Sequence, residues 1–211
     1  MDSISESVKI TLIGNSGVGK TCIIQRYTLG QYDDNSSTTR GANYSFKTII
    51  KNDKKIKLDL WDTAGQEQYR SLGKHFYKDS YIVILVYDIT NLDSFNDLKN
   101  IWYQDLIKYG EKYNIIAIVG NKCDLYEQEA VKEEEAREFA NSINSLFMLV
   151  SAKNGDNINS LFEAIIDKYL EPEFSSKVEE MKERAEGSMK IRKPKSSEEK
   201  KYQQLRKKGC C

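Results

Sequence analysis

The sequence predicts an α/β fold: a doubly wound, six-stranded and mostly parallel sheet with one antiparallel edge strand and helices on both faces. Apolar strand-like runs alternate with helical patterns, which is the arrangement of doubly wound folds. Two runs are apolar throughout, as buried parallel strands should be. Two others are joined by a turn too short for a crossover helix, so they should pair antiparallel. The six strand-like runs are Val8–Ile13, Tyr44–Ile50, Ile56–Trp61, Tyr81–Asp88, Ile115–Asn121 and Leu146–Ser151.

In chain order, the first run leads through a glycine-rich loop into a helical segment, Cys22–Leu29. The second and third runs flank the turn Lys51–Lys54 and form the expected edge pair. The fourth and fifth runs are apolar over Tyr81–Tyr87 and Ile115–Val119, so we expect them to be buried. The clearest remaining helical patterns are Ser94–Tyr109, Lys132–Ser142 and Ile158–Leu170.

The chain of 211 residues suits one domain followed by a tail. Pro172 ends the last apolar helical pattern, so we expect a domain at 1–172 and a tail at 173–211. Lys177–Glu186 can continue as an exposed helix. From Gly187 onward the chain has nine Lys or Arg and two Glu, a net charge of +7, and few aliphatic residues, which predicts disorder.

Composition excludes several function classes. The 32 basic and 32 acidic residues balance, so no nucleic-acid partner is indicated. The longest apolar run, Tyr81–Tyr87, is too short to span a bilayer, and the first residues lack the apolar stretch of a signal peptide. The four cysteines do not suggest a disulfide framework. We therefore expect a cytosolic protein.

The segment Gly14–Thr21 fits the pattern G-x-x-x-x-G-K-[ST] between a strand and a helix, the context of a phosphate-binding loop. Its backbone N–H groups and the helix N-terminus can face phosphate oxygens. Lys20 would reach the β- and γ-phosphates, and Thr21 would give its hydroxyl to Mg²⁺. A chance glycine-rich turn is the alternative, and the flanking strand and helix argue against it. The nucleotide contacts expected here are Ser16, Gly17, Val18, Gly19, Lys20, Thr21 and Cys22.

Two motifs at the ends of later strands indicate which nucleotide base would bind. Asn121-Lys122-Cys123-Asp124 follows the fifth strand, and the Asp124 carboxylate can accept hydrogen bonds from both guanine donors, which adenine lacks. Ser151-Ala152-Lys153 follows the sixth strand and can support the same base. Each motif alone could be an ordinary polar turn. Together with the glycine loop they lie where ligands bind in open α/β sheets.

The segment Trp61–Glu67 supplies the hydrolytic chemistry. Asp62 would hold Mg²⁺ through water. Gly65 would let the backbone approach the γ-phosphate, and Gln66 would orient the attacking water. Thr39 could supply a second hydroxyl to Mg²⁺, with Thr38 as a rival. Tyr32 could pack near the guanine, and an exposed turn tyrosine is the alternative.

With these motifs, residues 6–172 resemble the Rab family of Ras-like small GTPases, which share the P-loop NTPase fold. The resemblance implies a GTP/GDP switch of vesicle traffic with Mg²⁺, which hydrolyses GTP to GDP and phosphate. It also implies exchange factors, GAPs, a GDP-dissociation inhibitor, a prenylation escort and effectors as partners. The matching effector positions are Tyr44, Trp61 and Phe76, and Arg40 replaces a usual apolar contact. The motifs that carry the resemblance are Trp61–Glu67, Tyr69–Leu72, Phe76-Tyr77, Tyr87–Thr90 and Gly209-Cys210-Cys211.

The last two residues, Cys210 and Cys211, resemble the double-cysteine end of Rab proteins, which takes two geranylgeranyl groups. Two lipid chains give stable anchoring where one gives marginal binding. Arg206-Lys207-Lys208 would add attraction to an anionic leaflet. This predicts a protein of the cytosol and the cytoplasmic face of an endomembrane. The alternative for the tail is a pair of free thiols in solvated disorder.

Two other function classes remain open. One is an interaction module that binds GTP with negligible turnover, against which Lys20, Thr39, Asp62 and Gln66 argue. The other is an ATP-using P-loop kinase, against which the Asn121–Asp124 motif argues.

Overall fold

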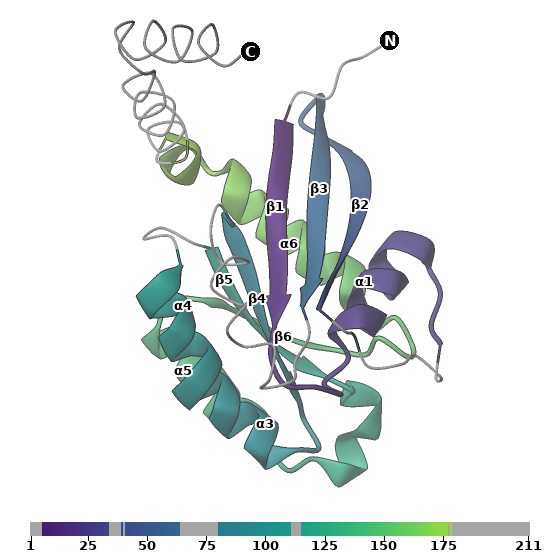
Figure 1. Ribbon diagram of the computed structural model, residues 1–211, viewed down its shortest axis with the longest axis vertical. Helices are drawn as coiled ribbons and strands as arrows, with labels where there is room; N and C mark the ends of the chain where they lie inside the picture. Colours follow the sequence, from purple (N-terminus) through teal and green to yellow (C-terminus); the bar gives the residue numbers. More distant parts are fainter. Residues whose placement is uncertain are drawn as a thin grey trace, which may run out of the picture. The chain divides into compact units, whose positions relative to one another are not determined.

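The computed structural model describes residues 6–33, 39, 41–63, 80–110, 115–176 and 178. The chain divides into two units, Met1–Tyr169 and Leu170–Cys211. The first unit contains a six-stranded sheet with helices (Figure 1). The second is described at 170–176 and 178, where 172–176 and 178 are helical. Among the described residues, no helix is both long and apolar enough to cross a membrane.

The sheet has the strand order β2-β3-β1-β4-β5-β6. Strands β2 and β3 pair antiparallel, and the other four neighbouring pairs are parallel. Strand β2 stands at the edge, so the predicted fold class is confirmed. The strands are β1 (Glu6–Ile13), β2 (Ala42–Lys51), β3 (Lys54–Thr63), β4 (Ile82–Asp88), β5 (Ile115–Asn121) and β6 (Leu146–Val150).

The tight turn between β2 and β3 explains their antiparallel pairing. Asn52 and Asp53 both have positive φ angles, 52° and 58°, as a two-residue hairpin turn that matches strand twist requires. The register that follows places Lys51 opposite Lys54 and Tyr44 opposite Trp61.

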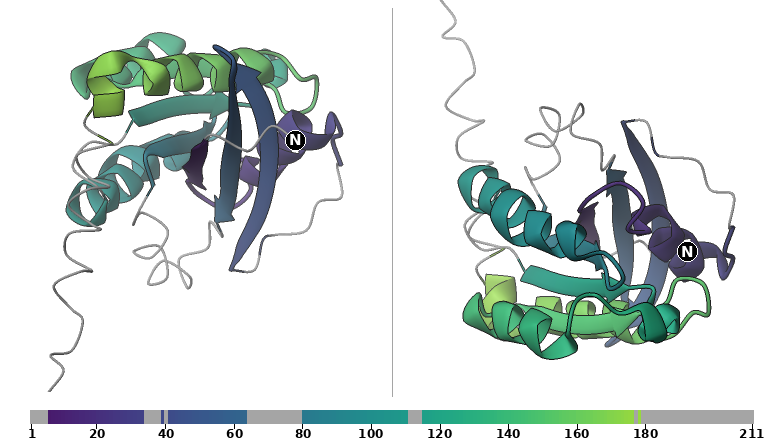
Figure 2. Two further views of the ribbon diagram at one scale, coloured as in Figure 1. Left: turned by 90° about the horizontal axis from the view of Figure 1, so that it is seen from above. Right: turned by 90° about the horizontal axis from the view of Figure 1, so that it is seen from below.

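Helices cover both faces of the sheet, as the two views of Figure 2 show. The residues of β4 are fully buried, so this strand contributes to the core on both faces. On one face, Tyr27 stacks on Phe162 with ring centroids 3.7 Å apart and joins two helices. On the other face, Leu85 and Phe95 belong to one buried cluster. The α-helices are α1 (Lys20–Leu29), α3 (Leu92–Asp97), α4 (Tyr103–Tyr109), α5 (Glu133–Ser142) and α6 (Ile158–Leu170).

The helix predicted at Ser94–Tyr109 differs from the observed segment in two ways. It begins earlier, at Leu92, because the side chain of Asn91 accepts a hydrogen bond from the Ser94 N–H and caps the helix. It is also interrupted by a π-helical turn, η2 (Leu98–Trp102). The exposed helix predicted at 177–186 lies outside the described residues, apart from Val178.

Candidate functional site

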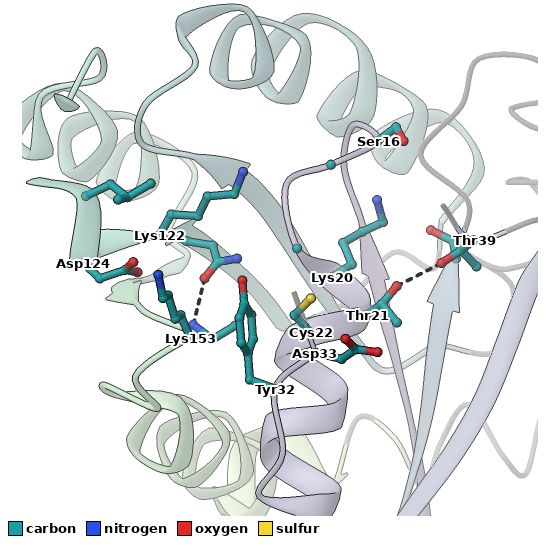
Figure 3. A pocket seen from close by; sticks show the side chains of 16 residues that line it. Ser16, Lys20, Thr21, Cys22, Tyr32, Asp33, Thr39, Lys122, Asp124 and Lys153 are labelled. Atoms are coloured by element: carbon teal, nitrogen blue, oxygen red, sulfur yellow. Dashed lines mark hydrogen bonds between the residues drawn. The ribbon is translucent and has the colours of Figure 1, made fainter. Parts of the chain in front are cut away.

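A cleft of about 420 Å³ opens at the carboxyl ends of the strands. Figure 3 shows Asp124 and Lys122 on one side of it, Lys20 and Thr21 on the other, and Tyr32 between them. Strands β1, β3 and β5 end at the loops that line the cleft, where open α/β sheets bind ligands. The lining residues are Ser16, Gly17, Gly19, Lys20, Thr21, Cys22, Tyr32, Asp33, Thr39, Thr63, Asn121, Lys122, Asp124, Leu125, Ala152 and Lys153.

In the glycine loop between β1 and α1, the backbone lies very close to neighbouring segments of the protein. Gly14 has φ 144°, and a Cβ there would lie 2.2 Å from the carbonyl oxygen of Val86. Gly19 has φ 94°, and a Cβ there would lie 2.2 Å from the Asn121 amide nitrogen. Neither position can hold a larger residue without displacing its neighbour. Helix α1 begins directly after the loop, so its first N–H groups are available at the cleft.

Lys20 is buried at the start of α1, with 5% of its surface exposed. Its Nζ donates to the carbonyl oxygens of Gly14 at 2.8 Å and Asn15 at 2.7 Å. Burial lowers the pKa of Lys20 to about 8, although the nearby Asp62 carboxylate opposes this shift. An anion in the cleft would favour the charged ammonium again.

Two hydroxyls and one carboxylate converge beside the glycine loop. The Thr21 hydroxyl lies 2.8 Å from Asp62 Oδ2 and 2.9 Å from the Thr39 hydroxyl, which is 3.1 Å from the same carboxylate oxygen. Burial raises the pKa of Asp62, while bonds from Thr21 and the charge of Lys20 lower it. The other oxygen, Asp62 Oδ1, is buried without a hydrogen-bond partner among the described residues.

This donor set fits Mg²⁺. Hydroxyl and carboxylate oxygens are hard ligands, and Mg²⁺ is commonly bound by one or two protein oxygens together with phosphates and water. The unpartnered Asp62 Oδ1 leaves capacity for a further bond. Within the described part of the chain there is no group of three or more His, Cys, Asp or Glu that could hold a metal by itself. The described protein oxygens at this point are those of Asp62, Thr21 and Thr39.

The opposite side of the cleft is joined to the glycine loop by Asn121. Its Nδ2 donates to the Val18 carbonyl at 2.8 Å, and its Oδ1 accepts from the Ala152 N–H at 3.1 Å. The Ser151 hydroxyl donates to Asp124 Oδ1 at 2.5 Å. Three segments far apart in sequence are thereby held in one arrangement, because each buried polar group is satisfied by another segment.

Lys122 has a left-handed backbone, with φ 70°, at the turn after β5. Its Nζ lies 2.5 Å from Asp88 Oδ2 at the end of β4. The ion pair holds the Lys122 side chain toward the end of β4, and Lys122 forms part of the cleft wall.

Arg26 on α1 is a site residue that sequence reasoning missed. Its Nε donates to the Ala152 carbonyl at 2.8 Å, its Nη1 to the Gly30 carbonyl at 2.8 Å, and its Nη2 to the Lys153 carbonyl. The guanidinium thus fixes the backbone of the loop after β6. A lone arginine in a helical pattern gives no signal of this role, because the two partners in the loop after β6 are main-chain atoms more than a hundred residues away.

Other predicted residues lie outside the cleft or outside the described residues. Val18 and Ser151 are buried behind the lining. Tyr44 and Trp61 lie on paired strands, with ring centroids 5.5 Å apart, and the Tyr44 hydroxyl lies 2.5 Å from Asp59 Oδ1. The predicted positions outside the described residues are Thr38, Arg40, Gly65, Gln66, Phe76, Cys210 and Cys211.

Comparison with known proteins identifies the family. The sequence profile of the Ras family matches residues 9–171. Over 155 residues the chain is 42% identical to the human Ras-related protein Rab-22A, a match that covers 74% of this chain and 79% of that protein. It is 41% identical to human Rab-30 over 154 residues, covering 73% and 75% of the two chains. It is 39% identical to RABD2c of Arabidopsis thaliana over 157 residues, covering 74% and 77%. The chain therefore belongs to the Ras family and, within it, to the Rab-related small GTPases.

Proposed function

We propose that this chain is a GTP/GDP switch of vesicle trafficking, held on the cytoplasmic face of an endomembrane by its C-terminal tail. The observation that carries the proposal is the junction made by Asn121. Its one side-chain amide bonds both the phosphate loop, at Val18, and the loop after β6, at Ala152. This connection supports a phosphate site and a base site within a single cleft of nucleotide size.

Guanine is the base that this cleft suits. Asp124 presents a carboxylate, an acceptor of two hydrogen bonds, and the Ser151 hydroxyl holds one of its oxygens. Guanine has two adjacent donors for such a group, and adenine has none in that position. Tyr32 and Lys153 would contact the bound nucleotide from the cleft wall.

On the phosphate side, Lys20 would exchange its two carbonyl contacts for β- and γ-phosphate oxygens. Thr21, Thr39 and Asp62 would hold Mg²⁺, the last of them through water. Mg²⁺, when bound, neutralises charge on the β- and γ-phosphates. Thr39 belongs to the connection between α1 and β2. Its contact with Mg²⁺ would form when the γ-phosphate is present and break after hydrolysis, so this connection would change conformation with the nucleotide state.

Intrinsic hydrolysis should be slow, on the order of 10⁻⁴ to 10⁻² s⁻¹, unless a GAP supplies transition-state charge. The water-orienting role of Gln66 and the γ-phosphate contact of Gly65 rest on the sequence. The same holds for Arg40 and Phe76 as effector contacts, whereas Tyr44 is a described, exposed residue of β2. An exchange factor, a GDP-dissociation inhibitor, a prenylation escort and effectors complete the expected partners, and no nucleic acid is among them.

Competition and turnover test the nucleotide assignment. Fluorescent GDP bound to the purified full chain should be displaced by GTP and not by ATP at equal concentration. Single-turnover hydrolysis of GTP should be measurable, and Gln66→Leu should abolish its stimulation by a GAP. Equal displacement by ATP would contradict guanine selectivity. GTP binding without any turnover, with or without a GAP, would favour the alternative of a GTP-binding interaction module.

Membrane attachment requires its own test. The tagged full chain should localise to an internal membrane, and removal of Cys210-Cys211 should leave it in the cytosol, because two lipid chains provide the stable anchor. Substituting Arg206, Lys207 and Lys208 with Gln while keeping the cysteines should weaken attachment without abolishing it. Unchanged localisation after loss of both cysteines would contradict the lipid anchor.

A further inference from the structure

The helical segment beside the phosphate loop contains the π-helical turn η2, Leu98–Trp102. Its defining bond runs from the Tyr103 N–H to the Leu98 carbonyl, five residues back, where an α-helix bonds four residues back. The segment before it is α3 and the segment after it is α4, so one extra residue is accommodated within an otherwise continuous helix. Single π turns of this kind frequently occur at functional sites.

Asp97, which directly precedes this turn, and Trp102, its last residue, contact a single residue of the phosphate loop. The Asn15 Nδ2 donates to Asp97 Oδ2 at 2.7 Å, and the Trp102 Nε1 donates to Asn15 Oδ1 at 2.7 Å. The carboxylate can only accept and the indole N–H can only donate, so the two partners fix both ends of the Asn15 amide. We call Asn15, Asp97 and Trp102 the Asn15 clamp.

The π turn explains how residues five apart reach the same amide. In a regular α-helix with 3.6 residues per turn, positions five apart point about 140° away from each other. A turn whose hydrogen bonds join residue i to residue i+5 places such positions one above the other. Asp97 and Trp102 therefore share a face here, and that face is turned to the phosphate loop.

The clamp also connects to the buried lysine of the cleft. The main-chain carbonyl of Asn15 accepts from Lys20 Nζ at 2.7 Å. Holding the Asn15 side chain from the helix thus restricts the backbone that forms one wall around Lys20. Trp102 is only 4% exposed and its indole N–H donates to Asn15, so loss of Asn15 would remove the partner of a donor on a buried side chain, which is costly.

We propose that Asp97 and Trp102 are positioning residues of the phosphate loop, brought together on Asn15 by the π turn, and that they slow nucleotide release. This inference rests on the proposed function, because it names the part of the fold that holds the phosphate loop in its binding conformation. It predicts that the clamp acts as a unit: removing either hydrogen bond loosens the same loop.

The first experiment measures release of fluorescent GDP from the full chain. Trp102→Phe should accelerate dissociation about five- to tenfold, the effect of losing one hydrogen bond, and Asn15→Ala, which loses both bonds of the clamp, should accelerate it at least as much. The double variant should be no faster than the faster single variant, because both changes remove the same contact. Tyr103→Phe, an aromatic change one residue further along the helix, is the matched control and should keep the wild-type rate. Fully multiplicative effects in the double variant would overturn the clamp.

A charge-swap variant separates direct contact from general destabilisation. Asn15→Asp alone sets two carboxylates against each other and should accelerate release. Adding Asp97→Asn places an amide donor opposite the new carboxylate of residue 15, and this carboxylate can still accept from the Trp102 N–H. The double variant should therefore release GDP at a rate within about twofold of the wild-type rate. Absence of this rescue, with both proteins folded by circular dichroism, would contradict the proposal.

A deletion tests the geometric argument. Removing the exposed Asn100 brings Asp97 and Trp102 four positions apart, the spacing at which a regular α-helix places side chains on one face. This variant should lose the π turn, keep the clamp and keep the wild-type release rate. Release as fast as that of Trp102→Phe would show that a shared face is not the reason for the clamp.

A readout that needs no GTPase function completes the test. The indole N–H of Trp102, one of two tryptophans in the chain, should exchange slowly with solvent by NMR and exchange faster in Asn15→Ala. If the wild type binds no guanine nucleotide, the proposed function fails, and indole exchange then decides on the clamp alone. Equal indole exchange in wild type and Asn15→Ala would overturn the clamp whatever the nucleotide affinity.

Discussion

Side chains in and around the cleft form hydrogen bonds with other segments of the protein, and some of them also line the space for a ligand. Asn121 bonds two backbone segments, Ser151 holds Asp124, and Arg26 holds the backbone of Ala152. Buried polar groups without partners are costly, so each loop is held by bonds already present in the protein alone. A ligand that enters then needs less ordering of the protein, which favours tight binding.

Asp124→Asn should move base preference from guanine toward xanthine nucleotides, because an amide offers a donor where xanthine presents an acceptor. Affinity for GDP should fall, and affinity for xanthosine diphosphate should rise, in a competition assay. Asp124 and Glu127 both lie in a 3₁₀ helix, η3 (Cys123–Gln128); Glu127 is exposed, so Glu127→Gln is the control and should change neither affinity. Unchanged preference in the Asp124 variant would remove this residue from the base site.

Arg26→Ala should accelerate GDP dissociation by about tenfold, because the loop that carries Ala152 and Lys153 loses charge-assisted hydrogen bonds to its backbone. Arg26→Lys should recover only part of the loss, since a single ammonium cannot reproduce the fork of donors. Arg137→Ala, which removes an exposed pair with Glu133 on its own helix, should have no effect. The three dissociation rates are measured in the same buffer, and equal rates for Arg26→Ala and wild type would refute the role.

At the scale of elements, helix packing on the two faces of the sheet depends on aromatic contacts. On one face, Tyr27 of α1 stacks on Phe162 of α6, and Lys47 of β2 lies 3.9 Å above the centre of the Tyr27 ring. On the other, Phe95 of α3 meets Phe139 of α5 edge to face, with centroids 6.2 Å apart. Helix α1 starts at the glycine loop, so packing of α1 on α6 also fixes one wall of the cleft.

Phe162→Ala should lower the free energy of unfolding by about 3–5 kcal/mol, because it removes a fully buried ring and leaves a cavity against Tyr27. Phe162→Leu, which leaves a smaller void, should cost less. Ile107→Ala, at an exposed position of α4, should change stability by less than about 0.5 kcal/mol. Chemical denaturation at one fixed GDP concentration gives the three values, since bound ligand adds to apparent stability. A loss below 1 kcal/mol for Phe162→Ala would show that the contact is not a core contact.

The sequence predicted the sheet because strand period, turn length and motif spacing are local signals. The turn Lys51–Lys54, for example, was sufficient to give the antiparallel edge pair. The sequence did not predict the π turn. Leu98, Trp102 and Leu106 keep the four-residue apolar spacing of an α-helix, although the backbone hydrogen bond here joins residues five apart. The position of Asp124 at the cleft could be predicted from its motif, whereas the contacts of Arg26 required the tertiary structure.

At the scale of the whole molecule, buried tyrosines make stability depend on pH. Burial raises the pKa of Tyr27 to about 12, and burial likewise raises the pKa values of Tyr87 and Tyr169 above their ordinary range. The Tyr169 hydroxyl also donates to Glu6 at 2.6 Å, which ties α6 to β1 and favours the neutral phenol. Each of these rings contributes to the folded state in its protonated form.

The sign of the effect follows from proton binding. Above pH 10 the unfolded chain loses the Tyr27 proton, while the folded chain keeps it up to about pH 12. The unfolded state then binds fewer protons, so stability falls as pH rises through this window and is independent of this group below it. The slope for one such tyrosine is at most about 1.4 kcal/mol per pH unit.

Tyr27→Phe should therefore lose less stability than the wild type between pH 9 and pH 11, because it has no proton to release on unfolding. The ring and its stacking on Phe162 are retained in this variant. Urea unfolding at the two pH values gives the four free energies, and Tyr126→Phe, the same change at a tyrosine 70% exposed, is the matched control. Identical pH dependence of wild type and Tyr27→Phe would mean that the phenol of Tyr27 is hydrated in the folded protein and titrates as it does in the unfolded chain.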